Sequence, residues 1–129
     1  MVHSNEDLLR RGYEAFSKGD MQTLDELFAD DIVWHVGGRN QLSGDYRGKE
    51  DVFNLFGKWA ELSGGTLTVE IHDVLANDEH AVALQRGTGS REGRTIDDNG
   101  VGVYHVRDGK VTEAWFHAGD AYASDEFWG

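Results

Sequence analysis

Cysteine and proline are both missing from this chain of 129 residues. The lack of cysteine excludes disulfides and thiolate metal sites, whereas the lack of proline carries no functional message. No apolar run approaches the roughly 20 residues that cross a membrane. The stretch from Val2 to Phe16 lacks the long apolar core of a signal peptide. We therefore expect a cytoplasmic protein that makes no contact with a membrane.

Basic residues are also scarce. Lysine and arginine together number 12, against 24 aspartates and glutamates, which gives a net charge of −12. Nucleic acid is excluded as a partner, because neutralising its phosphates needs clustered lysine and arginine. The acidity is typical of a well-solvated surface. The length suits a single domain over residues 1–129 with one hydrophobic core.

The first half of the chain has the 3.6-residue period of amphipathic helices. Ser4-Asn5-Glu6-Asp7 resembles a capping box at the start of a first helix, which Lys18-Gly19 ends. Asp20 can cap a short second helix. A third helix begins near Gly48 and ends at Ser63-Gly64-Gly65.

The stretch from Ala29 to Gly48 is the most informative part of the chain. It reads as a helix end, a short strand at Ile32–Val36, a glycine-rich loop and the start of the third helix. Trp34 and His35 lie on that strand, so a large apolar surface and a titratable group adjoin a flexible segment. This arrangement favours a pocket for a small molecule.

After residue 66 the period changes from 3.6 to two. The alternation predicts strands over residues 67–72, 80–91, 95–107 and 111–118, separated by the turns Asn77-Asp78-Glu79, Glu92-Gly93 and Asp108-Gly109. Residues 120–128 form a short helix or a tail folded back on the body. Helices followed by a four-strand antiparallel meander, with Ile32–Val36 added at the edge, define an α+β fold. Apolar residues on both parities of the strands predict that the outer sheet face is a homodimer interface or is covered by the tail.

Four motifs carry a resemblance to a known family. They are Phe16-Ser-Lys-Gly-Asp20, Leu27-Phe-Ala-Asp-Asp31, Leu42-Ser-Gly-Asp-Tyr-Arg-Gly48 and Val103-Tyr-His-Val-Arg-Asp-Gly-Lys-Val-Thr-Glu-Ala-Trp115. With the order of elements, they resemble the NTF2-like superfamily, and within it the SnoaL-like and ketosteroid-isomerase-like proteins. The resemblance implies a cone of about three N-terminal helices packed on a strongly curved, mainly antiparallel sheet, with a pocket at its open end. Such motifs specify the fold well and the activity poorly.

The catalytic positions that this resemblance implies are not filled. The base, the tyrosine and the protonated aspartate of steroid isomerases would fall at Val36, Gly12 and Gly102, so that mechanism is disfavoured. The aspartate of SnoaL-type polyketide cyclases would fall at Phe116. The Arg-x-Asp of limonene-epoxide-hydrolase-like proteins corresponds to Arg86-Gly-Thr88, which keeps the arginine and loses the acid.

The turn at Asp108-Gly109 decides which side chains of the last two strands share a face. A two-residue loop pairs Gly102 with Trp115, whereas a three-residue loop with a bulge pairs Gly102 with Ala114. We favour the second register, because it groups the small Gly102 and Ala114 with Phe116 on an inner face with room for a cavity. Trp115 then lies on the outer face.

Three residues are candidates for proton transfer. His35 has a pKa range that suits a general base or a hydrogen-bond donor, unless it faces the outer side of the sheet, opposite Trp34. His117 and Asp120 could pair as a base and its orienting carboxylate at the end of the last strand. The alternative for Asp120 is that it caps the final helix.

Five residues are candidates for substrate binding. Trp34, Phe116 and Phe53 would supply apolar wall. Arg86 lies on an apolar parity and needs either a carboxylate partner or an anionic ligand. Tyr104 would donate a hydrogen bond from the inner face.

No cofactor or metal ion is expected. The chain has no phosphate-binding glycine loop and no paired-histidine spacing, and His35, His117 and Asp120 could bind a metal only if their strands are neighbours. The first hypothesis is a dimeric, cofactor-free isomerase, cyclase, dehydratase or hydratase that acts on an apolar organic molecule. The second is a binding module without chemistry. A third is an interaction subunit whose outer sheet face binds a different protein.

Overall fold

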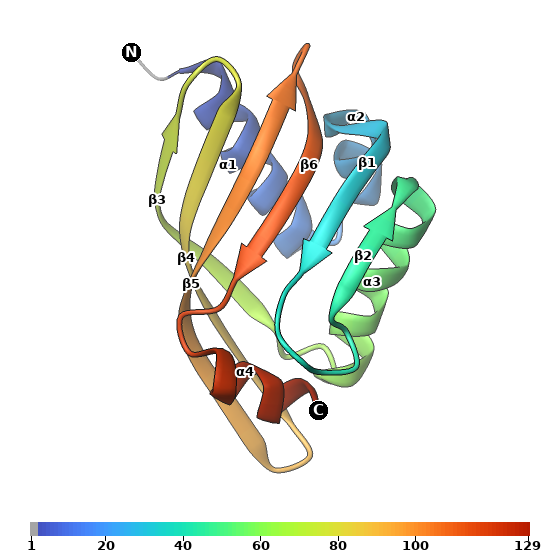
Figure 1. Ribbon diagram of the computed structural model, residues 1–129, viewed down its shortest axis with the longest axis vertical. Coiled ribbons are helices and arrows are strands. Elements are labelled where there is room, and N and C mark those ends of the chain that lie inside the picture. Colours follow the sequence, from blue (N-terminus) through green and yellow to red (C-terminus); the bar gives the residue numbers. More distant parts are fainter. Residues whose placement is uncertain (1–2) are drawn as a thin grey trace.

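The computed structural model describes residues 3–129 as helices packed on one face of a single sheet (Figure 1). The helices are α1 (Ser4–Lys18), α2 (Met21–Leu27), α3 (Gly48–Leu62) and α4 (Ala121–Trp128). The strands are β1 (Phe28–Val36), β2 (Gly44–Arg47), β3 (Thr68–Ala76), β4 (His80–Arg91), β5 (Arg94–Arg107) and β6 (Lys110–His117). The α+β class and the N-terminal helices on a mainly antiparallel sheet are confirmed.

The sheet has the order β2-β1-β6-β5-β4-β3. The predicted meander of β3 to β6 is antiparallel throughout, and β1 runs parallel to β6. In Figure 1, α1 and α3 lie behind the sheet, and α4 lies near the hairpin formed by the end of β4 and the start of β5. The core fills the space between α1, α3 and the inner sheet face, where Ile32, Val52 and Ala83 are fully buried.

Two of the predicted helix ends are found in the structure. Gly19 ends α1 in the left-handed conformation, with φ of 67°, and its N–H donates to carbonyls of the last turn. The Asp20 side chain caps α2 by accepting from the N–H of Thr23. The start of α1 differs from the prediction, because the cap is His3, whose Nδ1 accepts from the N–H of Asn5.

The prediction of an edge strand at Ile32–Val36 was wrong in position. β1 lies between β6 and a further strand, β2, which forms the edge of the sheet. β2 was missed because Gly44–Arg47 has the polar composition of a loop. Its pairing depends on tertiary contact with β1, which aligns Trp34 with Tyr46.

The β5–β6 hairpin has the predicted faces but not the predicted turn. Arg107 pairs with Lys110 around a two-residue turn, in which both central residues have positive φ. One extra residue in β6 then shifts the register, so that Gly102 pairs with Phe116 rather than with Ala114. The bulge lies inside β6 rather than in the turn, but it places the same side chains on the inner face as the predicted register does.

No helix within residues 3–129 has the length and apolar character needed to span a membrane.

Candidate binding and active site

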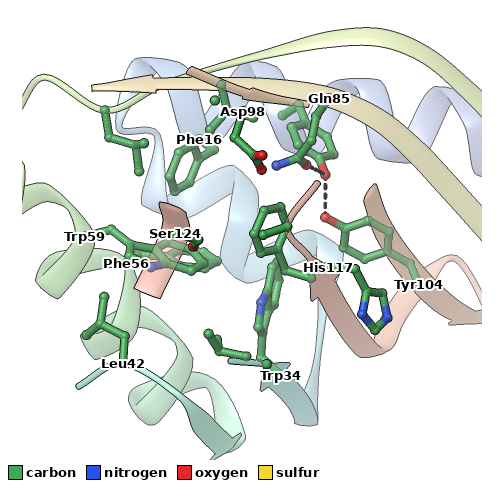
Figure 2. Close-up of a pocket in the computed structure, with 18 of the residues that line it drawn as sticks. Phe16, Trp34, Leu42, Phe56, Trp59, Gln85, Asp98, Tyr104, His117 and Ser124 are labelled. Atoms are coloured by element: carbon green, nitrogen blue, oxygen red, sulfur yellow. Dashed lines mark hydrogen bonds between the residues drawn. The ribbon is translucent and has the colours of Figure 1, made fainter. Parts of the chain in front are cut away.

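A cavity of about 280 Å³ lies between the inner sheet face, the N-terminal helices and α4. Most of its wall is apolar and aromatic (Figure 2). Its aromatic members include Phe16, Trp34, Phe56, Trp59 and Phe116. Trp34 and Phe56 meet edge to face with ring centroids 5.1 Å apart, a geometry that aromatic pairs favour. The cavity therefore has a rigid aromatic side.

Two glycines of β5 leave the room that these rings occupy. A Cβ atom at Gly100 would lie 2.9 Å from the ring of Phe116. A Cβ atom at Gly102 would lie 2.8 Å from the hydroxyl oxygens of both Tyr13 and Tyr104. The space beside Gly102 is thus filled by two tyrosine hydroxyls that arrive from α1 and from β5 itself.

A row of hydrogen bonds crosses the cavity wall at this point. The Tyr13 hydroxyl donates to Oε1 of Gln85 over 2.5 Å, and its oxygen lies 2.6 Å from the Tyr104 hydroxyl. A hydroxyl has one proton, so Tyr104 donates to Tyr13 while Tyr13 donates to Gln85. Figure 2 shows Tyr104 and Gln85 at the two ends of this row, with dashed lines marking the hydrogen bonds between them.

Both tyrosines of this row stay protonated over the physiological range. Burial raises the pKa of Tyr13 well above its ordinary 10.0, and the neighbouring Tyr104 raises it further. Burial also raises the pKa of Tyr104, to about 12. Neutral hydroxyls therefore hold the orientation of the Gln85 amide.

The row ends in a free hydrogen-bond donor. Gln85 is nine-tenths buried, at 9% exposure, and lines the cavity. Its oxygen accepts from Tyr13, whereas its Nε2 has no hydrogen-bond partner in the described chain, residues 3–129. Because Gln85 pairs with Gly100 and Gly87 pairs with Asp98, Gln85 and Asp98 are diagonal neighbours on one face. An amide donor and a carboxylate acceptor thus border the same space.

Carboxylates also organise the mouth of the cavity. Asp98 accepts from the backbone N–H groups of Gly119 and Asp120, which fixes the start of α4. Oδ1 of Asp125, on α4, accepts from the N–H of Arg39 and from the Asn40 side chain. The loop after β1 and helix α4 are thereby joined across the opening.

Four of the predicted site residues border the cavity. Trp34, Tyr104 and Phe116 lie in its wall, and His117 lies at its rim with an exposed side chain. Trp34 is buried at 8% exposure, and its Nε1 has no hydrogen-bond partner within the described residues. The catalytic and binding roles of these four remain predictions.

His35 does not line the cavity, which corrects its assignment as the catalytic base. It alternates with Trp34 along β1 and lies on the outer sheet face, stacked on Trp115. Its two ring nitrogens each lie 2.6 Å from a carboxylate oxygen, of Asp45 and Glu113. Burial by itself lowers the pKa of His35, but these two hydrogen bonds outweigh it and hold the pKa above 6.5.

Three further predicted residues also lie outside the cavity wall. Arg86 is on the outer parity of β4 and forms a two-pronged ion pair with Asp97, which is the structural alternative considered for it. Asp120 caps α4 by accepting from the N–H of Ala123, and no hydrogen bond joins it to His117. Phe53 is half-buried and packs against the core, stacked on Phe28.

Three important cavity residues escaped prediction. Tyr13 lies one residue beyond Gly12, the position at which the resemblance implies a tyrosine. Gln85 precedes Arg86 on β4, and only Arg86 was predicted to bind the substrate. Asp98 lies in the polar run Asp97-Asp98-Asn99, where nothing but the inner parity of β5, shared with Gly100, could have singled it out.

The candidate metal ligands are not brought together. His35 lies on the outer face of the sheet, and Asp120 lies at the start of α4. Among the residues that the structure describes, no three histidine or carboxylate side chains form a group that could hold a metal ion.

The SnoaL-like domain family matches residues 9–114. The chain belongs to this family. An uncharacterized protein of Mycobacterium tuberculosis is 35% identical over 123 residues, which are 95% of this chain and 94% of that protein. The resemblance in the sequence motifs is therefore confirmed at the level of the family.

Solved structures confirm the fold. Bal32a, from a soil-derived mobile gene cassette, superposes with a TM-score of 0.95 at 38% identity, over 98% of this chain and 97% of that one. IdmH, a proposed polyketide cyclase of Streptomyces antibioticus, has a TM-score of 0.76 at 23% identity, over 90% and 92% of the two chains. Other neighbours are described as NTF2-like proteins or proposed polyketide cyclases. At these lower identities the likeness concerns the fold alone.

Proposed function

We propose that this protein binds a small apolar molecule carrying a carbonyl group and catalyses cofactor-free proton transfer on it. The observation that carries the proposal is the row Tyr104–Tyr13–Gln85, which ends in a free amide donor beside Asp98. An apolar cavity with a few convergent polar groups is the usual form of such a site. The occurrence of proposed polyketide cyclases among the structural neighbours agrees with this class of chemistry.

The Gln85 amide would hold the carbonyl oxygen. Its own oxygen accepts a hydrogen bond from the Tyr13 hydroxyl, which in turn accepts one from Tyr104, and successive hydrogen bonds of this kind polarise one another. The N–H groups of Gln85 therefore become better donors. A fixed donor in an apolar cavity stabilises negative charge that develops on the oxygen, at no cost of reorientation.

Asp98 would act as the base. A proton leaves the carbon next to the carbonyl and bonds to the Asp98 carboxylate, while the electron pair of the broken C–H bond moves to the carbonyl oxygen. The resulting enolate is held by Gln85. Where a C=C bond is conjugated with the enolate, return of the proton from Asp98 to the far carbon of that system completes an isomerisation. Where the carbon next to the enolate carries a hydroxyl group, its C–O bond breaks, the proton from Asp98 joins the departing hydroxide to give water, and a dehydration is completed.

Proton exchange on a ketone tests the proposal directly. With 2-tetralone in D₂O, we expect the protein to accelerate exchange of the hydrogens next to the carbonyl, followed by proton NMR. Asp98→Asn removes the base and should reduce the enzymatic rate by roughly 10²-fold or more. Gln85→Leu removes the amide donor and should cost a comparable factor.

Asp125→Asn is the matched control. It removes a carboxylate from the same cavity lining and leaves the Gln85 amide and Asp98 in place. Exchange that is undiminished by both Asp98→Asn and Gln85→Leu would contradict the assignment of these two residues.

A non-catalytic binding module is the second candidate. It is favoured by the engagement of Asp98, whose two oxygens already accept from backbone N–H groups at the start of α4. In that case 2-tetralone raises the melting temperature without any exchange above the uncatalysed rate.

A further inference from the structure

The charged groups that face the cavity are of one sign. Asp98 and Asp125 contribute to its lining, whereas no lysine or arginine in residues 3–129 does. The arginines near α4 point elsewhere, because Arg91 donates to the carbonyl of Phe127 and Arg94 to that of Glu126. A carboxylate or phosphate ligand would therefore meet two aspartates and no lysine or arginine, and His117 of the lining lies at the exposed rim.

The net charge of the whole chain acts in the same direction. At −12, the long-range field repels anions before they reach the mouth. Inside an apolar cavity the local repulsion is stronger, because charges are less screened there than in water. An uncharged ligand experiences neither the long-range nor the local repulsion.

The size of the cavity sets a second limit. A volume of about 280 Å³ lies at the lower end of the range for small-molecule pockets, which is roughly 300–1,000 Å³. A ligand of one or two rings fills that space. A four-ring skeleton has roughly twice as many atoms, and the rings of Phe56 and Trp59, stacked with centroids 5.5 Å apart, form a packed wall that leaves it less room.

A third observation gives the orientation of the ligand. The Nε2 amide of Gln85 has no hydrogen-bond partner among the described residues and, unlike Nε1 of Trp34, is not sealed from the cavity, so it can donate to an acceptor atom of a ligand. The nearby Asp98 carboxylate is an acceptor and suits a donor on the ligand, so a neutral group with both functions fits this corner of the wall.

We infer that the natural ligand is an uncharged molecule of one or two rings, which places a neutral oxygen function against Gln85, and that Asp98 and Asp125 exclude anionic ligands of the same shape. The inference rests on the proposed function only in using the same cavity. It concerns binding, so it holds or fails whether or not the protein catalyses proton transfer.

Two probes of nearly equal shape isolate the effect of charge. 2-Naphthamide is neutral, and 2-naphthoate is its carboxylate analogue at pH 7.5. We expect 2-naphthamide to raise the melting temperature of the full chain and to bind at least tenfold more tightly than 2-naphthoate in a calorimetric titration. A four-ring steroid ketone should give no shift.

Charge-removing variants complete the test. In Asp98→Asn and Asp125→Asn, the preference for 2-naphthamide over 2-naphthoate should shrink, most of all in the double variant. Asp97→Asn is the control, because Asp97 carries the same charge on the outer parity of β5 and does not line the cavity. It should leave the preference unchanged.

Three outcomes would overturn the inference. They are equal binding of 2-naphthoate and 2-naphthamide, tighter binding of the steroid ketone than of 2-naphthamide, and the absence of a shift with any two-ring probe. None of these depends on the proton-exchange experiment. A failure of the proposed chemistry is therefore distinguishable from a failure of this inference.

Discussion

Single residues decide the polar character of the cavity. Gly102 has no side chain, and two tyrosine hydroxyls occupy the space that a Cβ atom would take. The resemblance implies an acidic side chain at Gly102. Here Tyr104, two residues further along the same face of β5, supplies a polar group at that place instead. The hydrogen-bonding capacity is kept, while the group that supplies it has changed from a carboxyl to a phenol.

The buried Tyr104 makes the stability of the protein sensitive to alkaline pH. Its pKa is raised to about 12 by burial, from an ordinary value of about 10 in the unfolded chain. A raised pKa means that its contribution to stability is fully present below pH ~10 and is lost as the pH rises toward ~12. We expect the urea midpoint to fall steeply across this window.

Tyr104→Phe is the comparison for this prediction. It removes the ionisable group and keeps the ring, so the variant should lose less stability between pH 10 and 11.5 than the original chain. The measurement is urea unfolding followed by tryptophan fluorescence at each pH. Parallel pH profiles for the two proteins would contradict a role of Tyr104 in the alkaline loss.

At the scale of elements, α4 closes the open end of the cavity. Its start is held by Asp98, and its last carbonyls accept from Gln41, Arg91 and Arg94. Donors at the C-terminal end of a helix satisfy carbonyls that have no partner within the helix. These side chains join α4 to the loop after β1 and to the β4–β5 hairpin.

Loss of the α4 cap should loosen this closure. Asp120→Ala removes the side chain that accepts from the N–H of Ala123 and should cost about 1 kcal/mol, as N-cap losses generally do. We expect faster amide hydrogen exchange in residues 121–128. Mass spectrometry of peptides from that segment measures the change.

Asp20→Ala is the matched control, because Asp20 caps α2 in the same way, through the N–H of Thr23. It should lower the global stability by a similar amount and leave exchange in α4 unaltered relative to the rest of the chain. If Asp120→Ala leaves amide exchange in residues 121–128 as unaltered as Asp20→Ala does, the Asp120 cap contributes nothing specific to the closure of the cavity.

At the scale of the whole molecule, the sheet has two different faces. The inner face encloses the cavity and the core. On the outer face, one row of side chains crosses the strands in register and carries Leu75, Val82, Val103, Trp115 and His35. Leu75, on the edge strand β3, ends this row and is 55% exposed.

We propose that this outer row is the interface of a homodimer, since apolar sheet faces of this kind are normally covered. Light scattering after size-exclusion chromatography should give twice the mass of the chain. Val82→Glu should reduce the mass to that of a monomer, because it places a charge in the row. Tyr122→Glu, at the 90% exposed position on α4, should leave the dimer intact. A monomeric original chain would contradict the proposal.

Much of this architecture follows from local properties of the sequence. The periods of 3.6 and two, the cap at Asp20 and the glycine at position 19 predicted the main helices and the meander, because each depends on neighbours within a few residues. The turns at Glu92-Gly93 and Asp108-Gly109 were equally local, since positive φ angles are required there. The prediction that Trp34 and Phe116 supply apolar wall rested on strand parity together with the family resemblance.

The identity of the polar groups in the cavity was decided only by the tertiary structure. Tyr13, Gln85 and Asp98 come from α1, β4 and β5, and no local rule relates their side chains to one another. The same holds for His35, since parity alone left two faces open until β1 was placed between β2 and β6. The sequence by itself thus determined the fold and the apolar wall, which rest on short-range patterns. Long-range packing decided which hydrogen-bonding side chains and which carboxylates line the cavity.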